Sequence, residues 1–575
     1  MQNISSQGFN DFTLEYPQFK CLYQNPIAYF SAEYALDGNL PIYSGGLGVL
    51  SGDTIREASE FGLPFIGVGL MYKHGFFTQR IENNTQIEKD IDFDPSNAGM
   101  SLLLDADGNI FKQSIPIDNR HVFFQAWEYR VGGVTMFFLD TDVDENNDYD
   151  RGITSKLYGG NKETRILQEI ILGIGGEKTL FSRGIYPSLY HLNEGHSSFA
   201  ILGIIHHMMK LKSLSFEESY NQVKERIVFT NHTLVSAGND IFEVDLVRKL
   251  LADYANEVNI PVDKFISLGL YDGSFAMTIF AMNIAKKTNA VSKLHAVKAK
   301  DLWPDKELIA ITNGVNVTQW QMEDLRARLY VISIEKNIPI EIAATYLQGK
   351  ELELMHLRAK ELLLKEIGLI TGKILNSNAL TICWSRRFAE YKRPELIFYD
   401  IERLKKICFN SEYPVNIVFA GKAHPSDSIG KELIHNVYKI IDDNFSNRAV
   451  FIPNYSIPIS SLLVQGSDVW LNTPIRGLEA CGTSGMKASL NGVLQLTVKD
   501  GWSDEVDWNG LGWEIDDKNP ISVYERIEKE VVPMFFERKD EWMSMAKKTI
   551  VMSMSNFTTR RMLRDYLLKS YIECI

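Results

Sequence analysis

Several features are scarce or absent in this 575-residue sequence, and each absence excludes a class of protein. The five cysteines are scattered and include no CxxC pair, which favours a reducing, cytoplasmic compartment over a disulfide framework. The first residues are too polar for a secretory signal, and no uninterrupted apolar run is long enough to cross a bilayer. The net charge of −13 argues against nucleic acid as the main partner, because that binding depends on neutralised phosphates. We therefore expect no nucleic-acid partner and no membrane association.

The sequence also lacks a Walker loop, a low-complexity linker and a repeat at a solenoid period. Apolar residues make up 45% and charged residues 23% of the chain, which is typical of globular proteins. The length suggests two or three domains, each large enough to bury a substantial core.

Strand-like and helix-like segments alternate from end to end, which predicts an α/β fold. In the first half we expect strands within 25–34, 62–72 and 134–143. An amphipathic helix is predicted over 164–184, with Gly184 as its breaker.

A second series of the same kind begins after residue 312. A long charged helical region over 322–368 precedes four apolar segments that predict a separate parallel sheet, at 379–388, 415–422, 449–455 and 468–474. We therefore expect one domain over 1–312 and another over 313–555, packed together around a cleft. Ligands of open α/β sheets bind beyond the carboxyl ends of the strands, where the glycine-rich turns of this sequence fall.

One lysine follows a loop of small residues in the segment EACGTSGMKASL. Gly482, Thr483, Ser484 and Gly485 precede a predicted helix start, where free N–H groups and the helix dipole can bind a phosphate. Lys487 would lie in the first turn, where desolvation favours the neutral amine that condenses with aldehydes. Pyridoxal phosphate is an aldehyde that carries a phosphate, so it satisfies both features. By spacing alone, a solvated lysine after a helix-capping turn is the commoner arrangement.

Two further stretches could bind anions. Arg386, Arg387, Lys392 and Arg393 follow a predicted strand, and we expect them to converge on phosphate groups. An ordinary basic rim is the alternative, although positive charge at a helix start is unfavourable. The segment SGGLGVLSGD indicates another anion-binding turn only weakly, because Ser51 stands where a GxGxxG fingerprint requires glycine.

Polar residues follow two more predicted strands. His191, Glu194 and His196 lie in HLNEGHSSF, and His232 lies in FTNHT. Their spacing matches no zincin pattern, so we expect no metal site; neutral histidines that hydrogen-bond sugar hydroxyls suit such loops better. Structural histidines with satisfied hydrogen bonds are the default alternative. Asn313 in ITNGVN is, by itself, consistent with a simple turn residue.

In their order along the chain, these motifs resemble the α-glucan phosphorylases, the family of glycogen, starch and maltodextrin phosphorylases. The likeness runs from YFSAEYALDGNLPIYSGGLGVLSGD through YKHGFFTQRI, HLNEGHSSF, TNHT, TNG, RRFAEYKR and GKAHP to EACGTSGMKASLNG, and is strongest to the shorter prokaryotic branch. The resemblance implies a GT-B fold, in which two Rossmann-like domains face a central cleft. The first would bind glucan and phosphate, the second would bind pyridoxal phosphate, and a helix over 556–575 would pack back on the first.

The resemblance implies phosphorolysis of terminal α-1,4-glucosidic bonds, which releases glucose 1-phosphate with retention of configuration. The family mechanism uses the phosphate of pyridoxal phosphate as the acid–base partner of orthophosphate, which protonates the glycosidic oxygen and attacks the same face of the sugar. Two phosphates in contact repel each other by roughly several kcal/mol in a poorly screened site, so the basic cluster is what permits their approach.

The resemblance also assigns roles to individual residues. Lys487 matches the Schiff-base lysine, and Arg387 matches the arginine that draws in orthophosphate. Cofactor contacts are implied for Tyr72, Arg386, Lys392, Thr483, Ser484, Gly485 and Lys487. Substrate contacts are implied for Gly45, Gly46, Leu47, Glu194, His196, His232, Asn313, Arg387, Glu479, Cys481 and Gly482. Catalysis is expected to depend on Lys487, Arg387, Lys392, His232 and Glu479.

Three positions depart from the family pattern. Cys481 replaces a serine, while Ala389 and Ser456 stand where the longer branch has a histidine and an arginine near the cofactor. The cysteine leaves the affinity for the sugar and the donor preference open, whereas Ala389 and Ser456 predict a looser cofactor cage. The length of the chain and the resemblance also lead us to expect no covalent or nucleotide control.

Two other functions share parts of this pattern. A nucleotide-sugar-dependent GT-B glucan synthase would have the same architecture and basic cluster, but would need a nucleoside pocket. A non-catalytic glucan-binding scaffold would bind starch without releasing glucose 1-phosphate. The expected partners are an α-1,4-glucan, orthophosphate and glucose 1-phosphate, and a homo-oligomer is compatible with the sequence.

Overall fold

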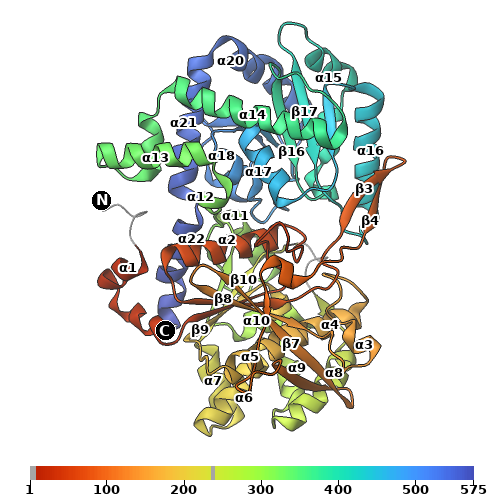
Figure 1. Cartoon of the computed structure of the whole chain (residues 1–575), viewed down its shortest axis with the longest axis vertical. Coiled ribbons are helices and arrows are strands. Elements are labelled where there is room, and N and C mark those ends of the chain that lie inside the picture. Colours follow the sequence, from red (N-terminus) through yellow and green to blue (C-terminus); the bar gives the residue numbers. More distant parts are fainter. Residues whose placement is uncertain (1–7, 235–239) are drawn as a thin grey trace.

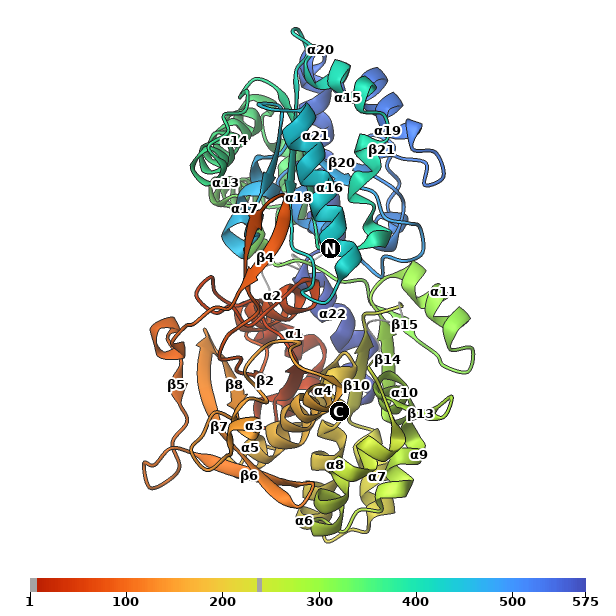
Figure 2. The ribbon, with the colours of Figure 1, turned by 90° about the vertical axis from the view of Figure 1, so that its right-hand side faces the viewer.

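The computed structural model describes residues 8–234 and 240–575, and it stacks two large sheets along the long axis of the molecule, each covered by helices (Figures 1 and 2). The predicted α/β class is confirmed. One hydrophobic core is built mainly from residues 9–311, and a second mainly from residues 315–557.

The first sheet has ten strands in the order β15-β14-β10-β9-β1-β2-β8-β7-β5, with β6 paired to β7. The strands from β15 to β8 run parallel, whereas β5, β6 and β7 pair antiparallel. Its strands are β1 (Ile27–Ser31), β2 (Phe65–Leu70), β5 (Ser101–Leu102), β6 (Lys112–Ile117), β7 (Arg120–Val131), β8 (Val134–Asp140), β9 (Leu189–Asn193), β10 (Ile227–Asn231), β14 (Lys287–Ala290) and β15 (Ile309–Ala310).

Burial along these strands follows their position in the sheet. Every residue of β1, β2, β9 and β10 is buried, because helices cover both faces of the parallel part. In β7, buried and less buried residues alternate over much of its length, as expected for an antiparallel strand with one face toward solvent. The three strands predicted in the first half are therefore confirmed.

The helix predicted over 164–184 forms as α4 (Lys162–Ile170), a π-helical turn (Ile171–Gly175) and α5 (Gly176–Ser182). A Cβ added at Gly173 within this turn would lie 2.3 Å from the backbone nitrogen of Ala200, so the glycine allows a close helix contact. The other helices of this half are α1 (Phe9–Glu15), α2 (Gly46–Phe61), α3 (Asp148–Arg151), α6 (Ala200–Lys212), α7 (Phe216–Lys224), α8 (Val244–Glu257), α9 (Val262–Gly269), α10 (Met277–Ile284) and α11 (Lys293–Leu302). A small antiparallel sheet joins β11 (Ile241–Phe242), β13 (Ser274–Ala276) and β12 (Leu270–Tyr271).

The second sheet is parallel throughout, with the order β18-β17-β16-β19-β20-β21. It contains the four strands predicted from the second half, together with two that were not predicted. Its strands are β16 (Leu380–Ser385), β17 (Val415–Ala420), β18 (Ala449–Ile452), β19 (Val469–Asn472), β20 (Leu494–Thr497) and β21 (Gly512–Glu514).

The charged region over 322–368 is divided where a single helical region was predicted. Helix α13 (Glu323–Lys336) ends at Asn337, which has a left-handed φ of 51°, and Pro339 precedes a 3₁₀ segment (Ile340–Tyr346) before α14 (Gly349–Thr371). The other helices of this half are α12 (Val317–Trp320), α15 (Ile401–Cys408), α16 (Ser428–Asn444), α17 (Ile457–Gly466), α18 (Ser484–Ser489), α19 (Ile521–Arg526), α20 (Val532–Glu537) and α21 (Lys539–Asn556).

The chain passes between the two halves at two adjacent places. Val315 on the outward path and Thr558 on the return path form a parallel β-bridge, and a Cβ at Gly314 would lie 2.2 Å from the Thr558 carbonyl oxygen. After the return, α22 (Thr559–Lys569) contributes to the first core (Figure 1).

A hairpin of the first half, β3 (Thr78–Glu82) and β4 (Thr85–Lys89), extends along α16 of the second half (Figure 1). Its buried Gln79 donates to the Gly421 carbonyl oxygen at 2.9 Å, and its buried Gln86 donates to that of Ala423 at 3.0 Å. These bonds fix the loop after β17 from the opposite half.

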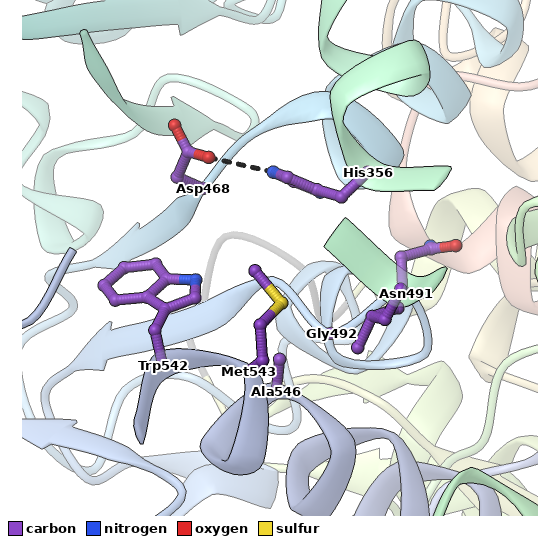
Figure 3. A pocket seen from close by; sticks show the side chains of 8 residues that line it. His356, Asp468, Asn491, Gly492, Trp542, Met543 and Ala546 are labelled. Atoms are coloured by element: carbon purple, nitrogen blue, oxygen red, sulfur yellow. Dashed lines mark hydrogen bonds and ion pairs between the residues drawn. The ribbon is translucent and has the colours of Figure 1, made fainter. Parts of the chain in front are cut away.

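A buried ionic cluster ties α14 to the amino end of β19. Asp468 accepts hydrogen bonds from Lys360 at 2.6 Å and from His356 at 2.8 Å, beside a cavity of about 10 Å³ (Figure 3). Burial would raise the pKa of Asp468, but its contacts with Lys360 and His356 lower it to about 2. The cluster lies at the opposite end of the strands from the residues described below.

All five cysteines are free. Within residues 8–234 and 240–575, none of the helices has both the length and the hydropathy required to span a membrane.

Candidate functional site

The predicted site residues lie beyond the carboxyl ends of strands in both sheets. Glu194 follows β9 and His232 follows β10 in the first sheet, while Arg386 follows β16 in the second. A hydrogen bond joins the loops of the two sheets: Ser292 Oγ, after β14, donates to the carbonyl oxygen of Ala480, after β19, at 2.6 Å. The two sheets therefore bring their loops together at one place.

Lys487 is buried within α18, and its Nζ lies 3.8 Å from the centroid of the Trp320 ring. Burial lowers the pKa of Lys487 to about 8, although the buried carboxylate of Asp53 opposes this shift. About a tenth of the amine is therefore neutral at pH 7, and the neutral amine is the form that attacks an aldehyde.

The small-residue loop before Lys487 packs closely against its surroundings. Gly482 has a φ of 81°, and an added Cβ there would lie 2.8 Å from Nη2 of Arg386. The side chain of Thr483, the residue at the N-cap of α18, makes no capping hydrogen bond, so its hydroxyl is not committed to the helix. Ser484 Oγ accepts a hydrogen bond from the indole of Trp470 at 3.3 Å. The left-handed φ of Gly482 favours glycine at this position, and a larger residue would also press on the Arg386 guanidinium.

Two of the predicted basic residues converge on one carboxylate. Oε2 of Glu479 lies 2.9 Å from Nζ of Lys392 and 3.1 Å from Nη2 of Arg386, and all three side chains are buried. Burial alone would raise the pKa of Glu479, but Lys392 and Arg386 outweigh it and lower the pKa to about 2. Arg386 also donates to the Asn472 side chain. The result is a buried cluster with more positive than negative charge.

The other two basic residues of this stretch do not join the cluster in the same way. Arg387 is exposed, yet its charge contributes to lowering the pKa values of Glu479 and His424. The prediction that Arg393 converges with the others is wrong. Its left-handed backbone, with a φ of 46°, turns the side chain to the carboxylate of Asp517 at 2.7 Å and to nearby carbonyl oxygens.

The turn of Gly45, Gly46 and Leu47 forms the start of α2, as an anion-binding turn requires. The buried Glu33 lies beside it and accepts hydrogen bonds from Gly45 N at 3.3 Å and from the hydroxyl of Tyr158 at 2.9 Å. Gly46 is exposed. This turn therefore already donates a hydrogen bond to a carboxyl group from within the chain.

Glu194 and His232 are joined in a network of neutral and polar groups. Glu194 has an unusual φ of 75°, and its Oε2 accepts from the backbone N–H of His232 at 2.8 Å. Burial lowers the pKa of His232 to about 3, so the ring is neutral, and its Nε2 donates to Oδ1 of Asn193 at 2.6 Å. Nδ1 of His232 then keeps a lone pair.

The other two histidines of this region have different partners. His191 contacts the hydroxyls of Tyr571 at 2.6 Å and Thr230 at 2.7 Å, so both its ring nitrogens are used within the core. Nε2 of His196 lies 3.3 Å from Oδ2 of Asp240. In the part of the chain that the structure describes, no group of His, Cys, Asp and Glu side chains is arranged to hold a metal ion.

Three further predicted residues are buried. Asn313 lies where the chain leaves the first half, and its Oδ1 has no partner among the residues described. Burial raises the pKa of the Cys481 thiol, which therefore stays protonated, and its carbonyl oxygen accepts from Trp502 N at 3.1 Å. Tyr72 donates its hydroxyl to the Ala32 carbonyl oxygen at 2.8 Å.

The two remaining departures from the family pattern lie at the starts of short helices. Ala389 precedes a 3₁₀ turn that contains Lys392, and Ser456 precedes α17 without capping it.

Sequence reasoning missed four residues that support this site: Asp53, Trp320, Glu33 and Asp240. Asp53 accepts from Trp320 Nε1 at 2.8 Å and thereby holds the ring that faces Lys487. Asp53 lies in the glycine-rich segment SGGLGVLSGD, where an acidic residue on an anion-binding helix could have signalled a buried cation. The other three lie far in sequence from the residues they contact, and no local pattern identifies them.

Comparison with known proteins places the chain in a family. Residues 167–509, more than half of the chain, match the phosphorylase family described as carbohydrate phosphorylase. Maltodextrin phosphorylase of Thermococcus litoralis is 38% identical in an alignment that covers 98% of this chain and 72% of that protein. Glycogen phosphorylase of Aquifex aeolicus is 36% identical, with 98% and 88% covered, and that of Mycobacterium tuberculosis is 33% identical, with 94% and 70% covered. The resemblance seen in the sequence is confirmed, and the chain belongs to the carbohydrate phosphorylase family.

Proposed function

We propose that this chain is an α-glucan phosphorylase, which uses orthophosphate to cleave terminal α-1,4-glucosidic bonds and releases glucose 1-phosphate with retention. Its relatives named above are maltodextrin and glycogen phosphorylases. The observation that carries the proposal is the buried amine of Lys487, whose pKa of about 8 suits attack on an aldehyde. It follows a small-residue loop that packs against the Arg386 guanidinium.

We further propose that the two cores correspond to two domains of a GT-B fold, with a boundary near residue 312 and a central cleft. The separate sheets and the contribution of α22 to the first core support this division. The meeting of both sets of strand ends supports the position of the cleft. A cytoplasmic location is proposed from the five free cysteines.

The residues present suit pyridoxal phosphate as the cofactor. Lys487 offers a desolvated amine, Thr483 an uncommitted hydroxyl, and Arg386 and Lys392 supply positive charge. We propose that Lys487 holds the aldehyde carbon, and that Thr483, Ser484 and Gly485 hold the phosphate. A contact of Tyr72 with the cofactor is proposed from the family resemblance alone. When bound, pyridoxal phosphate supplies a phosphate group that exchanges a proton with orthophosphate.

Arg386, Arg387 and Lys392 are proposed to hold the two phosphates together. Unscreened contact between the phosphates would cost roughly several kcal/mol, which the buried cations offset. Arg387 is exposed and is therefore placed to capture orthophosphate from solution. The amides of Gly46 and Leu47 are proposed to bind the same anion from the first domain.

The glucosyl unit is proposed to be held by neutral polar groups. His232 keeps a lone pair on Nδ1, and Asn313 has an Oδ1 that no described residue satisfies. Glu479 holds two cations in place and has acceptor capacity left for a sugar hydroxyl. Glu194, His196, Cys481 and Gly482 complete the proposed sugar contacts.

The proposed reaction is tested with purified protein reconstituted with pyridoxal phosphate. We expect orthophosphate-dependent release of glucose 1-phosphate from maltodextrins, and its loss in Lys487→Ala. Lys439→Ala, which changes an exposed lysine of α16, is the matched control and should remain active. Borohydride treatment followed by peptide mass spectrometry should locate the cofactor on Lys487.

Three outcomes would contradict the proposal. Release of glucose 1-phosphate by Lys487→Ala at the wild-type rate would remove the assigned role of the lysine. Glucosyl transfer from a nucleotide sugar without any response to orthophosphate would indicate the synthase instead. The scaffold alternative predicts starch binding with neither reaction.

A further inference from the structure

A buried carboxyl group outside the proposed set of contacts belongs to Glu169 on α4. Its side chain is buried, with an exposed fraction of 2%, and no described residue donates a hydrogen bond to either of its carboxyl oxygens. An ionised carboxylate in such surroundings would lack both solvation and a partner. Burial is the main cause that raises the pKa of Glu169 well above its ordinary value.

The carboxylate of Asp240 lies within hydrogen-bonding reach of Glu169. Asp240 is also bound by cations and donors: Nη2 of Arg165 lies 2.9 Å and Nε2 of His196 lies 3.3 Å from its Oδ2. Burial opposes ionisation of Asp240, but His196 and Arg165 outweigh it and keep its pKa low. Asp240 is therefore the ionised member of the pair, and Glu169 the protonated one.

Two carboxyl groups that face each other can form a hydrogen bond only if a proton lies between them. The charged and titratable groups facing Glu169 are Arg165 on its own helix, Asp240, and Tyr72 after β2, with His196 beyond Asp240. None of the first three donates a hydrogen bond to Glu169 in the structure, so a hydrogen bond between the two carboxyl groups requires the proton of Glu169 itself.

The pair is connected to two parts of the proposed substrate site. Asp240 fixes a proton on Nε2 of His196, whose buried Nδ1 has no partner among the described residues. Arg165 lies over the Tyr158 ring, 4.7 Å from its centroid, and the Tyr158 hydroxyl donates to Glu33 beside the Gly45 turn. A change in the carboxyl pair would therefore reach both the histidine and the anion-binding turn.

We propose that Glu169 and Asp240 share one proton and act as a positioning pair that sets the His196 ring and the Arg165 guanidinium for phosphorolysis. Glu169 supplies the donor and Asp240 supplies the charge. The connection to phosphorolysis rests on the proposed function, whereas the shared proton does not.

The test uses Glu169→Gln, whose amide keeps the size and the donor, and Glu169→Leu, which removes the donor. Difference infrared spectra of the folded full-length protein at pH 7 should show a carboxylic-acid carbonyl band in wild type that is missing from Glu169→Gln. The glutamine variant should retain activity within about threefold. The leucine variant should lose about tenfold or more, because a buried acceptor has lost its donor.

Stability against pH gives a second measurement. The folded protein binds a proton at Glu169 that the unfolded chain releases above the ordinary pKa of 4.5, so raising the pH destabilises wild type relative to Glu169→Gln. The ratio of their folding constants should fall by up to about tenfold per pH unit until Glu169 ionises in the folded state. Activity of wild type should also decline at alkaline pH where that of Glu169→Gln does not.

Identical infrared spectra, or parallel stability curves for wild type and Glu169→Gln, would overturn the shared proton. If the band is present but both variants keep the wild-type activity and pH profile, the positioning role is refuted. If the protein shows the band and the stability slope but no phosphorolysis, the pair stands and the proposed function fails. Should Glu169→Leu not fold, the glutamine variant and the spectra still decide the outcome.

Discussion

The carboxylate of Glu479 should be a major determinant of stability as well as of chemistry. It is the anion shared by the buried cations Arg386 and Lys392. Glu479→Gln keeps the shape of the side chain but removes its charge. Two buried cations then face each other without an anion between them.

The size of the effect follows from the structure. The folded protein lowers the pKa of Glu479 from 4.5 to about 2, which corresponds to about 3 kcal/mol of stabilisation at neutral pH. Removing one partner of a buried ion pair typically costs about 3–5 kcal/mol, in agreement with that value. Because the pKa is depressed, this stabilisation is complete above pH 4.5 and is lost as the pH falls toward 2.

Urea unfolding followed by tryptophan fluorescence would measure the change. We expect Glu479→Gln to lower the free energy of unfolding by about 3 kcal/mol at pH 7. Glu361→Gln, an exposed control on α14, should change it by less than about 0.5 kcal/mol. The difference between wild type and Glu479→Gln should shrink as the pH is lowered below 4.5. If Glu479→Gln unfolds at the same urea concentration as the control, the argument from the buried cluster is refuted.

Two further predictions concern other parts of the site. Asp53→Asn removes the anion that opposes desolvation at Lys487, so the pKa of Lys487 should fall below about 8. The pH dependence of the rate at which the apo-protein binds pyridoxal phosphate would measure it, and an unchanged midpoint would contradict the pairing. Gly314→Ala adds a Cβ 2.2 Å from the Thr558 carbonyl oxygen and should cost about 1–3 kcal/mol in calorimetry. Gly133→Ala, where the added Cβ meets nothing within 4 Å, is its control. Equal melting temperatures of the two variants would exclude strain where the chain passes between the two halves.

Strands and the glycine loop could be predicted because the signals are local. Apolar runs such as 415–422 read directly as buried parallel strands, and the small residues before Lys487 indicate a close backbone approach. The break in 322–368 was missed although Pro339 is visible, because the helical pattern continues on both sides of it.

Pairings between distant residues could not be predicted in the same way. The four basic residues after β16 look equivalent in sequence. Only the structure shows that Arg387 is exposed and that the positive φ of Arg393 directs its side chain away from the buried pair. Glu169 reads as one charge on an amphipathic helix, and its contact with Asp240 depends on how the helix packs. Contacts between charged residues that are distant in the sequence therefore could not be predicted.

The position of α22 has a consequence for how the protein is made. Tyr566 of α22 and the following Tyr571 complete a core that begins at Phe9. In that core Tyr566 forms a hydrogen bond with Thr230, and Tyr571 forms one with His191. Nascent domains generally fold in the order in which they leave the ribosome. Here the half synthesised first must wait with apolar surface uncovered until the whole of the other half has been translated. During this delay the uncovered apolar surface is available for chaperones to bind.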